Sequence, residues 1–154
     1  MRQVSLMAFL ASVGGIGSLP ASGTWGSVIG VGCGVLVVRT LPPWCALLLL
    51  VLTFIACAFI TTRAATYYHE HDPHAVILDE VWGMAAVFVI LPWTGSSVLW
   101  GLGAFLLFRL FDIVKPPPLR LLERCPAGWG IMADDGGAAV YTAAVLFLIH
   151  RLIR

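Results

Sequence analysis

The sequence predicts an all-α, polytopic membrane protein, with about five membrane-spanning helices in a single domain that covers residues 1–154. Hydrophobic residues make up 60% of the chain and charged residues only 11%, and the mean hydropathy is +0.95. Soluble domains are typically about 45–50% apolar and about 25% charged, so this composition indicates a chain embedded in a bilayer. The net charge of +1 gives no reason to expect nucleic acid as a partner.

The apolar runs define the predicted helices in order. An N-terminal run at about Val4–Val13 is too short to cross a bilayer, so we expect a short helix at the membrane interface. The predicted spans are Trp25–Val38, Trp44–Thr61, Pro73–Leu91, Ser96–Phe108 and Ala138–Ile149, each with approximate ends.

Short motifs explain where these helices begin, pack and end. Gly26, Gly30 and Gly34 recur every four residues, which places a smooth ridge on one helix face for close packing. Asp72-Pro73 suits a helix start, with Asp72 as the cap and Pro73 in the first turn. Arg109 and Asp112 share a helical face, and the prolines at 116–118 end that helix.

Residues 14–27 are rich in Gly, Ser and Pro and are predicted to form a loop before the first span. Such a loop can bring backbone N–H groups close to a phosphate, although a plain turn is the more frequent structure for this composition. No Gly-Lys-Ser/Thr follows, so the loop is not a nucleotide-binding P-loop.

The parity of five spans places both acidic loops on one side of the membrane. The loops at about 61–80 and 109–137 lie on the side of the N-terminus, whereas the turns at 39–43 and 92–95 lie on the other side. Six basic residues lie on the side of the acidic loops and three lie on the other side. The positive-inside rule therefore makes the side of the acidic loops cytoplasmic. All eight carboxylates then gather on or just inside this face: Glu70, Asp72, Asp79, Glu80, Asp112, Glu123, Asp134 and Asp135.

Two pairs of adjacent acids, Asp79-Glu80 and Asp134-Asp135, are the candidate metal ligands. Ionised neighbours repel unless a cation or a proton lies between them. An oxygen-only cluster at a cytosolic face favours Mg²⁺. The alternative is a set of helix caps and interfacial ion pairs, but apolar surroundings make uncompensated charge expensive, and this favours the metal.

Nearby basic and imidazole side chains complete the candidate site. Arg109 and Lys115 could bind a phosphate or anchor a span at the lipid head groups, and the pattern leaves both roles open. His71 is a candidate for proton transfer or phosphate binding, whereas His69 and His74 are expected to be solvated loop residues. Acids for Mg²⁺, cations and a Gly-rich loop together suit phosphoryl chemistry on a lipid head group.

Four blocks of the sequence resemble the bacterial phosphatidylglycerophosphatase A family. Ser22 and Ala139 stand where that family tends to have proline and glycine, and neither difference removes a charged group. The blocks, in order and at family-like spacing, are Gly17-x-x-Pro20-x-x-Gly23-Thr24-x-Gly26-Ser27, His71-Asp72-Pro73 with Asp79-Glu80-x-x-Gly83, Phe108-Arg109-x-Phe111-Asp112-x-x-Lys115-Pro116, and Gly130-Ile131-Met132-x-Asp134-Asp135.

The resemblance implies a Mg²⁺-dependent phosphatase of the bacterial inner membrane, with its active site facing the cytoplasm. Its substrate would be the phospholipid phosphatidylglycerophosphate, and its products phosphatidylglycerol and phosphate, in phospholipid biosynthesis. The absence of an Asp-x-Asp-x-Thr motif favours a metal-activated water over a carboxylate nucleophile. The implied site comprises catalytic His71, Asp72, Asp79, Asp134 and Asp135, metal ligands Asp79, Glu80, Asp112, Asp134 and Asp135, and phosphate-binding Thr24, Ser27, Arg109 and Lys115.

An ion or proton transporter that uses intramembrane carboxylates is the alternative function. Transport usually needs polar groups near the middle of the membrane and access from both faces. Here the predicted spans are apolar and all the acids lie toward one face, which favours the phosphatase.

Overall fold

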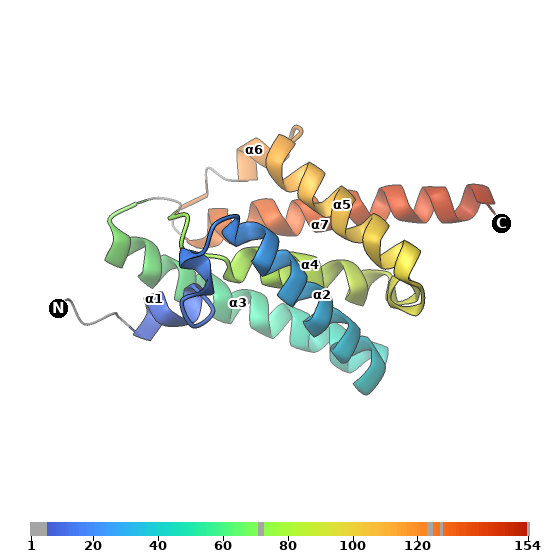
Figure 1. The fold of residues 1–154 in the computed structure, drawn as a ribbon, viewed down its shortest axis with the longest axis horizontal. Coiled ribbons are helices and arrows are strands. Elements are labelled where there is room, and N and C mark those ends of the chain that lie inside the picture. The colour runs from blue at the N-terminus through green and yellow to red at the C-terminus, as the bar shows by residue number, and fades with distance from the viewer. Residues whose placement is uncertain (1–5, 71–72, 123–124, 127, 154) are drawn as a thin grey trace.

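The computed structural model describes residues 6–70, 73–122, 125–126 and 128–153, and these ranges contain helices and connecting turns but no strand (Figure 1). The described helices are α1 (Leu6–Ala11), α2 (Ser22–Thr40), α3 (Pro43–Tyr68), α4 (Leu78–Ile90), α5 (Val98–Val114), α6 (Leu119–Leu122) and α7 (Gly128–Ile153), with 3-10 turns η1 (Ile16–Ser18) and η2 (Pro92–Ser96).

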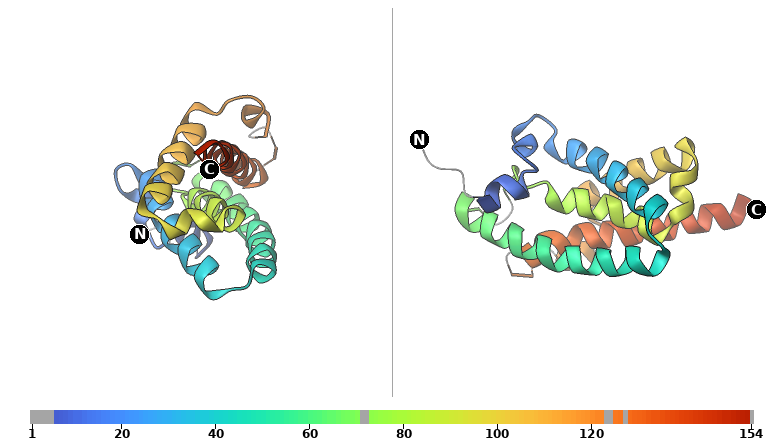
Figure 2. Two further views of the ribbon diagram at one scale, coloured as in Figure 1. Left: turned by 90° about the vertical axis from the view of Figure 1, so that its right-hand side faces the viewer. Right: turned by 90° about the horizontal axis from the view of Figure 1, so that it is seen from below.

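Helix α4 is the centre of the bundle. It contacts α2, α3 and α7, and the two perpendicular views in Figure 2 show it enclosed by these longer helices. Its side chains Met84, Val87 and Phe88 are fully buried, and they pack with Phe108 of α5 and Leu146 of α7 in the main hydrophobic core. The short central helix therefore fixes where its two N-terminal acids lie relative to the other helices.

The glycine ridge of α2 packs directly on α4, as the sequence predicts. A Cβ on Gly30 would lie 2.6 Å from the Val81 carbonyl oxygen and 2.7 Å from Met84 Cβ. A Cβ on Gly34 would lie 2.9 Å from Phe88 Cβ, and one on Gly26 would lie 3.0 Å from the Ile77 carbonyl oxygen. Only glycine allows the two helix backbones to come this close.

A second close contact joins α3 to α7. The backbone N–H of Gly128 donates a 3.0 Å hydrogen bond to Thr62 Oγ1, and a Cβ on Gly128 would lie 2.2 Å from Thr61 Oγ1. Trp82 on α4 donates its indole N–H to the Leu50 carbonyl oxygen on α3 at 3.1 Å. These contacts tie α3 to both α7 and α4.

Three helices, α2, α3 and α7, are long and apolar enough to cross a membrane. Helices α4 and α5 are shorter, with 13 and 17 residues, whereas a full crossing needs about 20. The chain is thus a helical membrane protein, and of the five predicted spans three, α2, α3 and α7, meet the length and composition of a span among the described residues. A helix is present at Leu6–Ala11, inside the predicted N-terminal segment.

The structure corrects three predicted helix starts. The third predicted span corresponds to α4, which begins at Leu78 and not at Pro73. The backbone N–H of Ile77 donates to the Ala11 carbonyl oxygen, and the Ser22 hydroxyl donates to the His74 carbonyl oxygen. These tertiary hydrogen bonds hold residues 73–77 outside the helix. The first span begins at Ser22, inside the predicted loop, and the last begins at Gly128, ten residues before Ala138. Asp134 and Asp135 therefore belong to a helix.

We expect Gly30→Ala to lower the stability of the folded bundle by about 1–3 kcal/mol, the usual cost of overpacking. The added methyl group would push α2 away from the Val81 backbone. Gly32→Ala on the same helix is the matched control, because nothing lies within 4 Å of its Cβ position, and helix propensity favours alanine there. Thermal unfolding in detergent measures both variants, and equal midpoints for the two would contradict the close contact between α2 and α4.

Candidate active site

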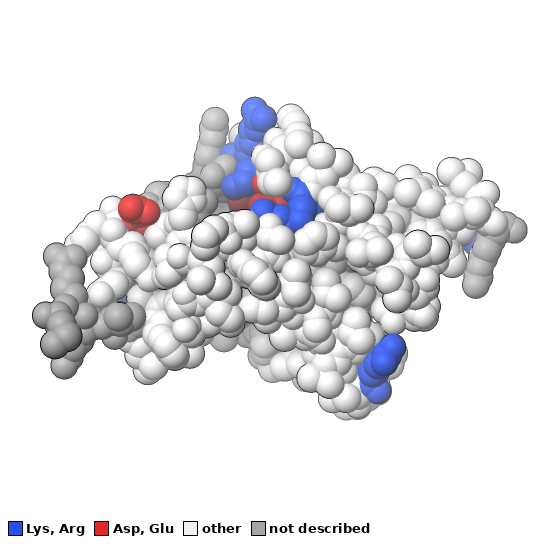
Figure 3. Space-filling model, in the orientation of Figure 1, with Lys and Arg blue, Asp and Glu red and all other residues white. Residues whose placement is uncertain are grey.

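A polar cavity of about 720 Å³ lies at the end of the bundle where α2 and α4 begin and α5 ends. In Figure 3 the charged side chains on this face gather mostly in one hollow, while the surface around it is largely uncharged. Four segments far apart in sequence line the cavity, namely residues 17–24, 73–80, 109–115 and 134–135. The predicted convergence is confirmed for five of the eight carboxylates, whereas Glu70 is not among the lining residues and Asp72 and Glu123 lie outside the described residues.

Asp79, Glu80 and Asp135 form a compact group that we call the carboxylate trio. One oxygen from each lies within 4.8 Å of the other two. Asp79 is 8% exposed and Asp135 2% exposed, and both Glu80 Oε2 and Asp135 Oδ2 are buried without a hydrogen-bond partner among the described residues. Buried carboxylate oxygens normally have partners, so these atoms fit direct coordination of a hard divalent cation.

Close helix packing brings the trio together. Asp79 and Glu80 are in the first turn of α4, and Asp135 faces them from α7. A Cβ on Gly83, one turn further along α4, would lie 3.1 Å from Asp135 Cβ and 2.9 Å from the Phe108 ring. The absence of a side chain at position 83 therefore lets Asp135 approach α4.

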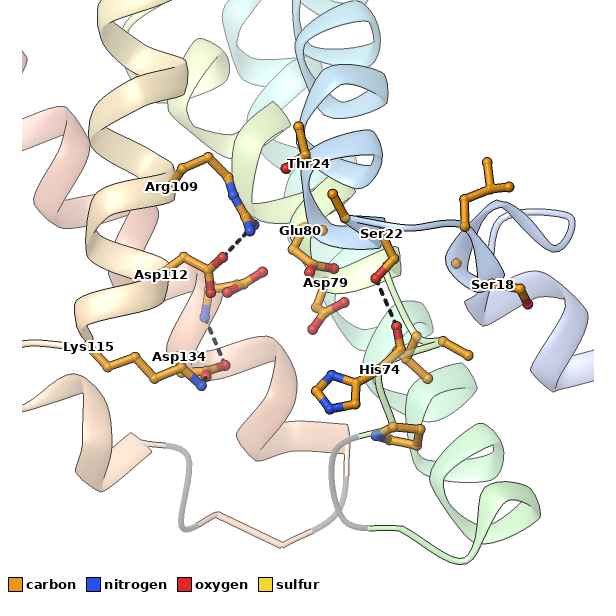
Figure 4. Close-up of a pocket in the computed structure, with 18 residues that line it drawn as sticks. Ser18, Ser22, Thr24, His74, Asp79, Glu80, Arg109, Asp112, Lys115 and Asp134 are labelled. Atoms are coloured by element: carbon orange, nitrogen blue, oxygen red, sulfur yellow. Dashed lines mark hydrogen bonds and ion pairs between the residues drawn. The ribbon is translucent and has the colours of Figure 1, made fainter.

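Two other acids of the cavity form ion pairs, one with Arg109 of α5 and one with Lys115, the residue that follows α5. Arg109 Nη1 donates to Asp112 Oδ2 at 2.6 Å, as the shared helical face predicts, and Lys115 Nζ donates to Asp134 Oδ2 at 2.5 Å (Figure 4). Asp134 Oδ1 accepts a 3.0 Å hydrogen bond from the backbone N–H of Asp135. Asp112 and Asp134, both predicted metal ligands, are not part of the trio, and their ion pairs hold the two cations in place.

The charges of the cavity do not balance. Five carboxylates and two basic side chains line it, and three of the carboxylates belong to the trio. Like charges in a partly buried site repel one another, and a bound divalent cation removes that repulsion. The two basic side chains border the trio, so the same cavity also suits a phosphate group placed between them and a metal ion.

The start of α2 forms the wall opposite α5. A Cβ on Gly23 would lie 2.5 Å from Glu80 Oε1 and 2.8 Å from Arg109 Nη1, so glycine leaves room for both side chains. Thr24 also lines the cavity. Ser27, a predicted phosphate ligand, is fully buried, and its hydroxyl donates to the Gly23 carbonyl oxygen at 2.9 Å. Ser27 therefore supports the helix and is not among the residues that line the cavity, because its side chain is buried inside α2 and bonded to the preceding turn.

Sequence reasoning missed that Ser22 and His74 line the cavity. His74 is exposed and lies outside the helices, as predicted for a solvated loop residue, and it also borders the cavity (Figure 4). Ser22 donates to the His74 carbonyl oxygen at 3.0 Å and so joins α2 to this loop. The contact spans 52 positions, and no local pattern indicates it. The predicted catalytic residues His71 and Asp72 lie outside the described residues.

We compared the sequence with family models and with known proteins. The family model described as phosphatidylglycerophosphatase A matches residues 9–150. The chain is 36% identical to phosphatidylglycerophosphatase A of Haemophilus influenzae over 97% of this chain and 94% of that protein. It is 33% identical to phosphatidylglycerophosphatase A of Escherichia coli, over 82% of this chain and 73% of that protein. It is also 33% identical, over 99% of both chains, to a Bacteroides thetaiotaomicron protein for which a phosphatidylinositol-3-phosphatase activity has been proposed. No solved structure matches the chain.

We expect Asp135→Asn to raise the thermal unfolding midpoint when divalent ions are removed by a chelator. The substitution removes one negative charge from a buried group of three, so it relieves part of the repulsion within the trio. Asp112→Asn is the control, because it leaves Arg109 without its carboxylate and should lower the midpoint. A lower midpoint for Asp135→Asn in chelator would show that the trio does not repel itself.

Proposed function

The chain belongs to the phosphatidylglycerophosphatase A family, and we propose that the cavity containing the carboxylate trio is its active site. The enzyme removes the terminal phosphate of phosphatidylglycerophosphate and leaves phosphatidylglycerol, a step of phospholipid biosynthesis. The observation that carries the assignment of the site is the trio itself, with two buried oxygens that lack hydrogen-bond partners among the described residues.

We assign Mg²⁺ to the trio. Its three carboxylates offer only oxygen atoms, which is the ligand set that Mg²⁺ prefers, and their spacing suits a single ion. When bound, Mg²⁺ supplies Lewis-acid polarisation of the phosphate and neutralises charge that builds up during hydrolysis. Asp79 and Asp135 would hold the ion from two different helices, and Glu80 would complete the set from the side nearest Arg109 and Gly23.

Arg109 and Lys115 are proposed to bind the phosphate. Asp112 and Asp134 hold the two basic groups at fixed positions by ion pairs, so little side-chain freedom is lost when a phosphate arrives. The first residues of α2, Ser22, Gly23 and Thr24, line the same cavity, and a helix N-terminus favours an anion. Catalysis of phosphoryl transfer consists mostly of such positioning and charge neutralisation.

The membrane position of the site follows from the charges along the chain. Arg63, Arg109, Lys115 and Arg120 lie toward the end of the bundle that holds the cavity, whereas Arg39 and Arg151 lie at the far ends of α2 and α7. The positive-inside rule therefore supports a cytoplasmic active site in the bacterial inner membrane. A lipid head group can enter the cavity there while its acyl chains stay in the bilayer.

We expect Asp79→Asn to lower phosphate release from phosphatidylglycerophosphate by at least about 100-fold, because it removes one ligand and one charge from the trio. The purified protein is assayed with and without Mg²⁺ on phosphatidylglycerophosphate, phosphatidic acid and phosphatidylinositol 3-phosphate. Full turnover by Asp79→Asn would refute the assigned role of the trio. Hydrolysis of phosphatidylinositol 3-phosphate alone would contradict the assigned substrate.

We expect Gly23→Ala to lower kcat/KM about 10- to 100-fold while the protein stays as stable as the wild type. The added methyl group would displace the ends of Glu80 and Arg109, and displacements of this size are costly in catalysis. Gly32→Ala has the same chemical change on the same helix with nothing nearby, and it should keep full activity. Equal activity of the two variants would show that the wall of α2 does not position Glu80 and Arg109.

A further inference from the structure

A second cavity, mostly apolar, lies between α2 and α5. Its volume is about 510 Å³, and we call it the α2–α5 groove. Val28, Val31 and Val35 of α2 form one side, and Val98, Leu102 and Phe105 of α5 form the other. Phe88 of α4 and the η2 turn close its floor, and Arg39, Ser96 and Ser97 lie at the end far from the active site.

The groove continues the active-site cavity along the same two helix faces. On α2, Thr24 lines the cavity and Val28, one turn later, lines the groove. On α5, Arg109 lines the cavity and Phe105, one turn earlier, lines the groove. Residues four apart lie on one face of a helix, so the polar and apolar sections form one path from charged to uncharged surface. Figure 1 shows the two helices side by side, with α5 ending where α2 begins.

We propose that the α2–α5 groove binds one acyl chain of the lipid substrate while the head group occupies the active-site cavity. The inference rests on the proposed function, and it adds a chain-binding site to the phosphate-binding site. A lipid phosphomonoester has a charged head joined to apolar chains, and the path between the helices has the same order of charged and apolar sections.

The length of the groove matches one leaflet. From Val28 to Arg39 the groove extends about 16 Å along α2, at 1.5 Å per residue. Half of a bilayer's hydrocarbon core is about 15 Å, which is the depth that the acyl chains of one leaflet occupy. A chain whose head group is in the cavity would therefore run the length of the groove without leaving its own leaflet.

Packing contacts, and not the hydrophobic effect, would hold an acyl chain in the groove. A lipid chain is already in an apolar solvent, so entering the groove removes no apolar surface from water. Its contribution is to align the lipid, since a chain held beside α5 keeps the phosphate near Arg109 and the trio. Blocking the groove should therefore affect turnover of long-chain substrates and spare short-chain substrates.

Gly101 offers a way to block the groove without disturbing the bundle. Its Cβ position faces the groove, and the nearest atom is the Thr94 carbonyl oxygen at 3.9 Å. We expect Gly101→Phe to lower kcat/KM roughly tenfold for phosphatidylglycerophosphate with two sixteen-carbon chains, the size of effect that filling an apolar pocket produces. Activity on the same head group with two six-carbon chains should stay within about twofold of wild type.

Gly32→Phe is the matched control, because Gly32 also has an open Cβ position but does not line the groove. It should leave the ratio of long-chain to short-chain activity unchanged. A Gly101→Phe variant with the wild-type ratio would overturn the proposal, as would an equal loss of activity on both substrates. Wild-type protein that hydrolyses neither substrate would contradict the proposed function itself.

Photolabelling tests the groove without reference to turnover or to a variant's folding. A phosphatidylglycerophosphate analogue with a diazirine in one acyl chain is irradiated with the wild-type protein in vesicles, and labelled peptides are sequenced. Labels on Val31, Leu102 or Phe105 that unlabelled substrate suppresses would support the proposal. Labels spread over all lipid-facing helices, or insensitive to the competitor, would show annular lipid only and overturn it.

Discussion

The mutual repulsion of Asp79, Glu80 and Asp135 is the constraint on which the rest of the structure depends. Three carboxylates within 4.8 Å of one another, two of them nearly inaccessible to solvent, cannot be a by-product of burying apolar surface. The bundle holds them together by contacts that favour close approach, above all at Gly83 on α4 and along the glycine ridge of α2. The energy of helix packing thus maintains an acidic cluster that electrostatics alone would disperse.

The charged side chains of the cavity fall into two groups with different roles. Asp112 and Asp134 are engaged with Arg109 and Lys115, while the trio faces a space large enough for a phosphate group. All five acids lie at one end of the bundle, and α4, which carries two of them, is apolar and buried beyond its first turn. That arrangement suits a lipid phosphatase. A transporter would need acidic groups near the middle of the membrane, and the described residues beyond the cavity end of the bundle include none. The groove between α2 and α5 extends the same arrangement to the chains of the lipid.

The sequence predicts the main features of the site because charge is scarce in a membrane chain. Span parity brings the acids together, and the spacing of Arg109 and Asp112 predicts their ion pair. The pairing of Lys115 with Asp134, across 19 positions and two helices, has no local signature. Apolar runs also place helix starts too late, because they exclude polar residues such as Asp134 that lie inside the first turns of α7.

Binding of a divalent cation to the purified protein tests the central claim most directly. Calorimetric titration with Mg²⁺, supported by paramagnetic resonance of Mn²⁺, reports binding without any substrate. The trio predicts saturable binding by the wild type that Asp135→Asn abolishes and Asp112→Asn retains, since Asp112 is paired with Arg109. No saturable binding by the wild type, or equal binding by Asp135→Asn, would contradict the account.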